Sequence, residues 1–224
     1  MRMRRKKNLE TRLADCADWL KIPAMPDDRD FRAAKEQAAF IDLDGWFAKK
    51  QPLWLEIGCG RGQFAAELAK QHPEVNILAV EKVANVIVAA AEKAKEQELP
   101  NLRLLNCAAE YLPRYLHPHT VERLYLNFSC PFPKARYAEH RLTSERFLPI
   151  YDALLTENAE IHQKTDNRAF FEYSIEKLTG FGFALKNVSL DLHASDFEGN
   201  IVTEYEKRFA DLGQPIYRLE AYRR

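Results

Sequence analysis

A chain of 224 residues, 46% hydrophobic and 29% charged, is long enough for one substantial α/β domain and short for two. Basic and acidic residues both number 33, so the zero net charge excludes nucleic-acid binding through bulk positive charge, and any such binding requires a local cluster of cations. Four scattered cysteines argue against a zinc site or a disulfide framework, so we expect no metal. No apolar run approaches the roughly 20 residues of a membrane span, and no signal peptide is visible, so we expect a cytoplasmic protein.

The N-terminal part of the chain is predicted to be an extension of the main domain. Residues 2–7, R-M-R-R-K-K, form a basic arm, which is either a solvated tail or a segment that contacts phosphates. Helical patterns over residues 11–20 and 31–47 are interrupted by the sequence P-A-M-P-D-D. We therefore predict a basic arm and helical extension over residues 1–50, and the main domain over residues 51–224.

The stretch P-L-W-L-E-I-G-C-G-R-G, residues 52–62, combines a strand with a glycine loop. Its apolar part predicts a buried parallel strand, inside which the carboxylate of Glu56 needs a partner. A helix-forming segment follows at once, and glycines without a Cβ let backbone amides approach a ligand; they are Gly58, Gly60 and Gly62. A tight turn with no ligand is one interpretation. In the dinucleotide-binding alternative the third glycine comes one residue later, whereas this spacing after an acid is typical of class I S-adenosylmethionine-dependent methyltransferases.

The next two predicted strands also end in polar residues. The strand over residues 75–80 ends at Glu81, which is placed to bind the ribose hydroxyls of a nucleoside, or else is a solvated acid at a strand end. The separation of Gly62 and Glu81 is close to the roughly 20 residues of such sites. Asn106 ends the strand over residues 102–106 and is a candidate contact for adenine. A nucleoside site at this edge is favoured.

Strands and helices alternate through the rest of the chain with short turns. This pattern predicts an α/β fold with a doubly wound, mostly parallel sheet. Helices are expected at 83–98, 108–116 and 169–179, and further strands at 121–127, 157–165, 183–190 and 215–222.

The segment N-F-S-C-P-F-P-K-A-R-Y-A-E-H-R-L, residues 127–142, follows the fourth of these strands. Its basic residues are interleaved with aromatic ones, which suits a splayed base and its phosphates, although a rigid proline loop with solvated charges is the alternative. Two polar clusters follow, at residues 165–167 and 203–206. Asp166 is expected to cap the next helix, and Thr203 and Glu206 have the spacing to share one face of a helical turn.

These motifs together resemble the bacterial tRNA (guanine-N7-)-methyltransferase family, over roughly residues 53–222. The resemblance implies a Rossmann-like class I methyltransferase that uses S-adenosylmethionine to methylate a guanine in the variable loop of tRNA. By position, the expected cofactor-binding residues are Glu56, Gly58, Gly60, Gly62, Glu81, Asn106 and Cys130. The expected substrate-binding residues are Lys134, Arg136, Asp166, Thr203, Glu204, Tyr205 and Glu206, with Cys130 and Asp166 also assigned to catalysis.

The proline loop departs from the family pattern D-P-W-P-K-x-R-H-x-K-R-R. Cys130 stands at the aspartate, Phe132 at the tryptophan and Tyr137 at the histidine, and the final basic run is E-H-R. The alternative function is therefore a weak or inactive paralogue that binds S-adenosylmethionine, tRNA or both. A third hypothesis is a methyltransferase that acts on another nucleic acid or on a small molecule. Monomer and homodimer both stay open.

Overall fold

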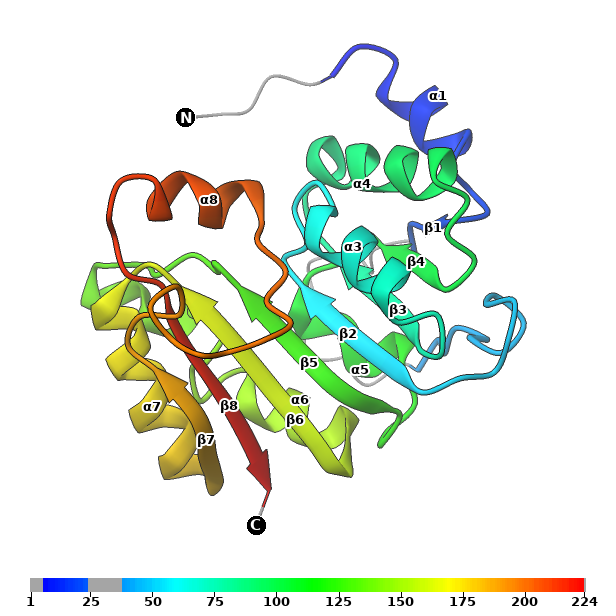
Figure 1. Cartoon of the computed structure of the whole chain (residues 1–224). Helices are drawn as coiled ribbons and strands as arrows, with labels where there is room; N and C mark the ends of the chain where they lie inside the picture. Colours follow the sequence, from blue (N-terminus) through cyan, green and yellow to red (C-terminus); the bar gives the residue numbers. More distant parts are fainter. Residues whose placement is uncertain (1–5, 24–37, 224) are drawn as a thin grey trace. The chain divides into compact units, whose positions relative to one another are not determined.

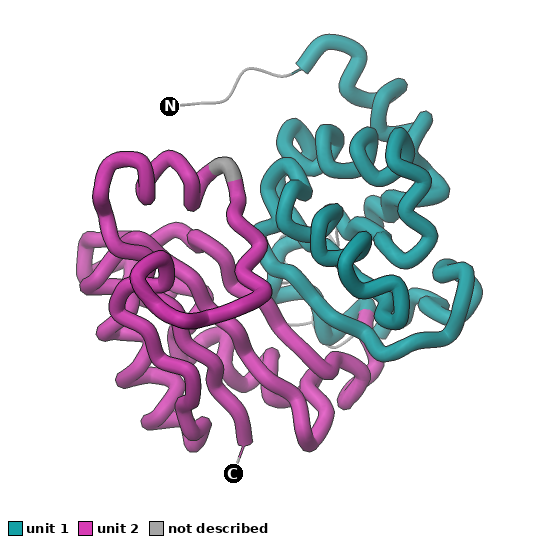
Figure 2. The backbone as a smooth tube through the Cα atoms, viewed as in Figure 1, with its two compact units in different colours: residues 1–115 teal, residues 116–224 magenta. Residues whose placement is uncertain are grey.

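The computed structural model describes residues 6–23 and 38–223, and contacts divide the chain into two units, Met1–Tyr115 and Leu116–Arg224 (Figure 2). The predicted basic arm lies outside the described residues except for Lys6 and Lys7. In the described parts of the chain, no helix is long and apolar enough to cross a membrane.

The first unit contains a four-stranded parallel sheet in the order β1-β4-β3-β2 (Figure 1). All five residues of β2 and of β3 are buried, as expected for parallel strands that are covered on both faces. The strands predicted at 53–57, 75–80 and 102–106 are confirmed to within one residue. The elements are α1 (Leu9–Ala14), β1 (Leu20–Lys21), β2 (Leu53–Ile57), α3 (Gln63–Gln71), β3 (Asn76–Val80), α4 (Ala84–Glu96), β4 (Leu102–Leu105), the 3-10 helix η2 (Ala109–Tyr111) and α5 (Leu112–Tyr115).

Helix α4 forms because its alanine-rich sequence places small apolar residues on one side. Ile87, Ala91 and Ala94 are fully buried at helical spacing, and Ala90 beside them is also buried. Helix α3 packs against α4 as well as against β3. The alanines keep the side chains of α4 short at this contact, so the two helices approach closely.

The N-terminal extension corrects one prediction. The helix expected over residues 11–20 ends at Ala14, and Leu20 instead pairs in parallel with Leu104, which extends the sheet by the short strand β1. The amide of Leu104 donates to the carbonyl of Trp19 at 2.7 Å. Pairing with the edge of β4 satisfies backbone groups that a longer helix would have used, so tertiary context overrides the local pattern.

The helix expected over residues 31–47 does not form in its described part. Residues 38–47 have no helical segment, and the remainder lies outside the described residues. The carboxylate of Asp42 accepts a hydrogen bond from the amide of Gly45 at 2.9 Å. Such a side-chain-to-backbone bond stabilises a turn in competition with a helix.

The second unit contains four strands in the order β5-β6-β8-β7 (Figure 1). Strands β5 and β6 are parallel, whereas β8 runs antiparallel to both β6 and β7. The sequence indicated the strands, while α6 and the 3-10 helix η3 were not predicted. The elements are β5 (Val121–Asn127), η3 (Ala135–His140), α6 (Leu148–Leu154), β6 (Leu155–Thr165), α7 (Arg168–Phe181), β7 (Phe183–Ser189), α8 (Glu204–Ala210) and β8 (Tyr217–Arg223).

From Ala159 to Thr165, strand β6 has one uncharged face and one charged face. Gln163 points toward α7, where its amide donates to the hydroxyl of Ser174 at 2.9 Å. Because successive side chains alternate across a strand, Glu160, His162 and Lys164 lie on the opposite face. This second face carries the charged groups described below.

Candidate cofactor and substrate sites

The three glycines of the loop after β2 have different roles. Gly58, Gly60 and Gly62 have φ angles of 81°, 58° and 71°, a left-handed conformation that favours glycine. A Cβ added to Gly58 or Gly60 would meet nothing within 4 Å, whereas a Cβ on Gly62 would lie 2.6 Å from the Cβ of Ala90. The first two glycines therefore leave open space at the end of β2, and the third permits close packing of α3 on α4.

Backbone hydrogen bonds hold this loop against the neighbouring strand. The amides of Gly58 and Cys59 both donate to the carbonyl of Val80, at 2.8 and 3.0 Å. Helix α3 begins directly after Gly62, which provides no side-chain cap. The N-terminal end of α3 therefore presents its amides and the positive end of its dipole to an anionic group such as a carboxylate.

Two carboxylates lie near the buried thiol of Cys59. Burial raises the pKa of this thiol well above its ordinary value, and the charges of Glu56 and Glu81 raise it further. Glu56 is itself buried on β2, with 3% of its surface exposed. Burial and these two carboxylates together keep the thiol of Cys59 neutral.

The strand ends β3 and β4 position Glu81 and Asn106. The carboxylate of Glu81 accepts a hydrogen bond from the amide of Val83 at 2.9 Å, which fixes its orientation at the start of α4. The side-chain amide of Asn106 donates to the carbonyl of Glu81 at 2.7 Å, and the backbone amide of Asn106 donates to Lys21 on β1 at 2.9 Å. The structure thus brings Glu56, Glu81 and Asn106 to one edge of the first unit's sheet, together with the glycines.

In the second unit, the proline loop of residues 127–142 is held in an unusual backbone conformation. Phe128 and Phe132 have φ angles of 50° and 41°, which bulky residues rarely adopt. The guanidinium of Arg141 donates to the carbonyls of Pro131 and Phe132 at 2.9 and 3.1 Å. These bonds stabilise the strained loop from its own C-terminal side.

Three predicted site residues of the proline loop are exposed. Cys130, Lys134 and Arg136 all lie at the surface of the second unit. The guanidinium of Arg136 lies 4.8 Å from the ring centre of Tyr137, so one of the two cations rests on an aromatic face. A surface of this kind suits phosphates and bases.

The predicted helix cap at Asp166 is wrong, because the next residue makes the cap. The side chain of Asn167 accepts from the amide of Phe170 at 2.8 Å at the start of α7, and the hydroxyl of Thr165 accepts from the amide of Asn167 at 3.1 Å. Asp166 is half-buried and caps nothing. The carboxylate of Asp166 is therefore not used as the cap of α7. Its role in substrate binding stays a prediction.

Tyr205 lies close to both predicted catalytic residues. Burial raises the pKa of its hydroxyl, and the neighbouring side chains of Asp166 and Cys130 act in the same direction, whereas Arg208 lowers the pKa. The ring of Tyr205 lies 5.2 Å from that of Phe128, yet the residue is 48% exposed. An exposed aromatic ring beside a carboxylate is suited to stacking on a base.

The predicted helical turn at Thr203 is the start of helix α8. The hydroxyl of Thr203 caps this helix by accepting from the amide of Glu206 at 3.0 Å. The side chain of Glu206 is fully buried, and its carboxylate accepts from Lys164 and from Asn200, both at 2.6 Å. Sequence reasoning missed Lys164, although a lysine inside a buried strand was a signal that a carboxylate partner exists. Nothing is described of the side chain of Glu204.

A cluster on the charged face of β6 and β8 has the composition of a metal site. Ligand atoms of Glu160, His162 and Glu220 lie within 4.8 Å of one another. His162 donates to Glu160 at 2.7 Å, which together with Lys186 lowers the pKa of Glu160 to about 2 despite its partial burial. Arg218 pairs with Glu220. Lys186 and Arg218 already balance the two carboxylates, so the cluster is a charge network.

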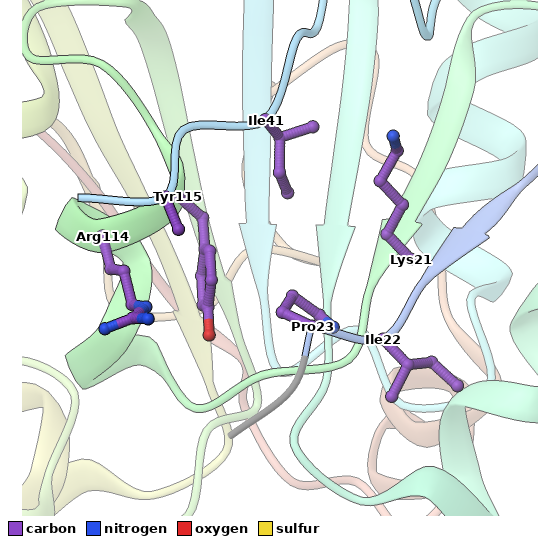
Figure 3. Close-up of a pocket in the computed structure, with 7 residues that line it drawn as sticks. Lys21, Ile22, Pro23, Ile41, Arg114 and Tyr115 are labelled. Carbon is purple, nitrogen blue, oxygen red and sulfur yellow. The ribbon is translucent and has the colours of Figure 1, made fainter. Parts of the chain in front are cut away.

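One cavity of the first unit is lined by none of the predicted site residues. Its volume is about 410 Å³, and in Figure 3 the ring of Tyr115 and the side chains of Ile41 and Pro23 border it. The lining residues are Lys21, Ile22, Pro23, Ala39, Ile41, Arg114 and Tyr115. None of them was predicted to bind cofactor or substrate.

Comparisons with known proteins show what the chain is similar to. A family model described as "Putative methyltransferase" matches residues 50–219. A tRNA (guanine-N(7)-)-methyltransferase of Macrococcus caseolyticus (strain JCSC5402) is 46% identical over 198 residues, which cover 86% of this chain and 94% of the relative. The protein of the same name from Staphylococcus carnosus (strain TM300) is 47% identical over 189 residues, which cover 81% and 90%.

Solved structures of methyltransferases have the same fold. The antibiotic-resistance methyltransferase Kmr has a TM-score of 0.57 at 16% identity, with 81% of this chain and 91% of that chain covered. A SAM-dependent methyltransferase from Aquifex aeolicus has a TM-score of 0.54 at 15% identity, with 77% and 82% covered. The predicted α/β, Rossmann-like methyltransferase fold is therefore confirmed.

Proposed function

Because the chain belongs to the tRNA (guanine-N(7)-)-methyltransferase family, we propose that it transfers a methyl group from S-adenosylmethionine to N7 of a guanine in the variable loop of tRNA. The observation that carries this proposal is the glycine turn after β2. Its left-handed Gly58 and Gly60 border open space, while Glu81 and Asn106 follow at the ends of the next two strands.

The residues of the first unit fit the cofactor chemically. The N-terminal amides of α3 suit the carboxylate of its methionine part, and the acids Glu56 and Glu81 suit its ammonium and ribose hydroxyls. Asn106 offers an amide to the adenine. When bound, S-adenosylmethionine supplies a methyl group activated by a sulfonium; transfer breaks the C–S bond, forms the C–N7 bond and leaves S-adenosylhomocysteine.

The residues of the second unit are proposed to position the guanine. N7 already has a lone pair, so no side chain has to remove a proton, and correct alignment is the main requirement. Methylation would place positive charge on the guanine ring, and the carboxylate of Asp166 would stabilise that charge in the transition state. Lys134 and Arg136 are suited to the phosphates, and Tyr205 to stacking on the base.

Cys130 is the reason for a second candidate function, a paralogue that binds S-adenosylmethionine, tRNA or both without catalysis. The family pattern has an aspartate at this position, whereas this chain has an exposed thiol in place of the carboxylate. Loss of one transition-state contact typically costs about 10²–10³ in rate, which weakens an enzyme without abolishing its chemistry. The expected activity is therefore slow methylation.

The wider context of the protein is also part of the proposal. We take residues 51–224 as the methyltransferase domain and residues 1–50 as its basic arm and helical extension, which the family match over residues 50–219 supports. The expected partner is tRNA, bound through local clusters of cations in a protein of zero net charge. The expected location is the cytoplasm.

A methyl-transfer assay tests the proposed function. The full chain is incubated with labelled S-adenosylmethionine and an unmodified tRNA transcript, and the product nucleoside is identified by mass spectrometry. We expect 7-methylguanosine, and none from a matched transcript whose variable-loop guanines are replaced by adenine. Tight binding of both cofactor and tRNA without any product would instead establish the binding paralogue.

A further inference from the structure

We propose that Lys164 is a positioning residue that joins the proline loop to helix α8 and so sets the place of Tyr205 in the substrate site. The inference rests on the proposed function, because it takes the proline loop and Tyr205 as parts of the guanine site. No sequence motif assigns Lys164 a role, and the proposal is based on its contacts with the proline loop and with helix α8.

The side chain of Lys164 attaches α8 to the end of β6. Its ammonium lies 2.6 Å from the carboxylate of Glu206, 2.9 Å from the carbonyl of Ile201 and 3.0 Å from the side-chain oxygen of Asn200. Three acceptors match the three protons of an ammonium. Lys164 is 6% exposed and Glu206 is fully buried, so water does not replace these bonds easily.

The backbone of the same residue holds the proline loop. The carbonyl of Lys164 accepts from the amide of Phe128 at 2.8 Å, at the residue whose φ of 50° redirects the chain out of β5. The ammonium also lies 5.8 Å from the ring centre of Phe128, within the range of a cation–π contact. One residue therefore contacts both segments that carry predicted substrate residues.

The two segments meet at the rings of Phe128 and Tyr205. Their ring centres are 5.2 Å apart, and Tyr205 also lies 4.8 Å from Phe209 on the next turn of α8. The exposed side of Tyr205 is thus fixed by a ring from the proline loop and a ring from its own helix. A shift of α8 relative to Phe128 would change where a stacked base lies.

Stability alone is a poor reason for this arrangement. Replacing a buried ion pair by apolar residues of similar size is often neutral or stabilising, whereas removing one partner is strongly destabilising. A lysine that makes three directed bonds to three parts of one segment supplies a defined geometry, which an apolar contact does not.

The test compares three variants with the wild type. Lys164→Met leaves the charge of Glu206 buried without its ammonium partner, whereas the double variant Lys164→Met/Glu206→Leu removes both charges. Glu220→Gln is the matched control, because Glu220 is 5% exposed and belongs to a buried ion pair on neighbouring β8, with Arg218. Thermal unfolding, amide hydrogen exchange of residues 204–210, affinity for S-adenosylmethionine, and kcat and KM for tRNA are measured.

We expect Lys164→Met to lower the melting temperature and the double variant to recover it. In both, exchange in residues 204–210 and KM for tRNA should rise about tenfold or more, with unchanged cofactor affinity, because α8 has lost its directed bonds. Glu220→Gln should leave both the exchange of residues 204–210 and KM for tRNA at their wild-type values. The inference is overturned if exchange and KM return to wild-type values together with the melting temperature. Hydrogen exchange needs no turnover, so it decides the role of Lys164 even if the wild type methylates no tRNA and the proposed function fails.

Discussion

The contact between Gly62 and Ala90 allows one prediction to be worked out from the structure. In Gly62→Ala the new Cβ would lie 2.6 Å from the Cβ of Ala90 and 3.1 Å from its Cα, at a residue whose φ is +71°. Both the backbone and the packing of α3 on α4 are then strained. The substitution should destabilise the fold, although it adds only one methyl group.

The size of the effect has two parts. An L-residue in the left-handed region costs about 1–2 kcal/mol, and overpacking of a tight contact costs about 1–3 kcal/mol, so the free energy of unfolding should fall by about 2–5 kcal/mol. For a chain of this size the melting temperature falls by roughly 2–4 °C per kcal/mol. Gly60→Ala is the matched control, because its φ is +58° but its Cβ would meet nothing within 4 Å. Gly60→Ala should lower the free energy of unfolding by the backbone cost of about 1–2 kcal/mol alone, and it should weaken cofactor binding.

Urea unfolding followed by circular dichroism measures these differences. Adding Ala90→Gly to Gly62→Ala removes the closest overlap, so the double variant should be more stable than the sum of the two single effects by about 1–3 kcal/mol. Equal stability of Gly62→Ala and Gly60→Ala, with no coupling to residue 90, would refute the packing role of Gly62.

Three further predictions concern single side chains. Glu81→Ala should weaken binding of S-adenosylmethionine by about 2–5 kcal/mol in calorimetry, because two charge-assisted hydrogen bonds to the ribose are lost; unchanged affinity in a folded variant would remove Glu81 from the site. Cys130→Asp should raise the rate of tRNA methylation at least about tenfold, equivalent to about 1.4 kcal/mol, and no methylation by either protein despite tight binding would favour the paralogue. The pKa of Glu160, about 2 in the folded state against an ordinary 4.5, means that its contribution to stability is present at neutral pH and is lost as the pH falls from about 4.5 to about 2. Glu160→Gln should flatten the pH dependence of unfolding in that interval, and an unchanged slope would contradict the assignment.

The sequence predicted the elements whose signals are local. The strand over residues 53–57 and the helix after Gly62 were predicted because an apolar run around Glu56 and a glycine turn lie within one short stretch. Strand ends Glu81 and Asn106 followed from the same logic, since parallel strands end at one edge.

Other features depend on contacts between distant parts of the chain. The sequence shows that Glu206 is acidic, but only the fold shows that it is buried against Lys164, 42 positions away. Asp166 and Asn167 are both good capping residues, and only the structure shows that the side chain of Asn167 makes the cap of α7. Leu20 has an apolar side chain suited to a helix or a strand, and it forms a strand because it pairs with the edge of β4.

Strand β1 also determines how the sheet of the first unit ends. With β1 in place, the amides of Leu104 and Asn106 are paired to Trp19 and Lys21, and Arg12 of α1 holds the extension on Glu92 of α4 with bonds of 2.6 and 2.7 Å. A fragment that begins at residue 51 would present β4 as an uncovered edge, which is a template for pairing with other chains. Cutting the protein at the proposed start of the methyltransferase domain would therefore invite aggregation.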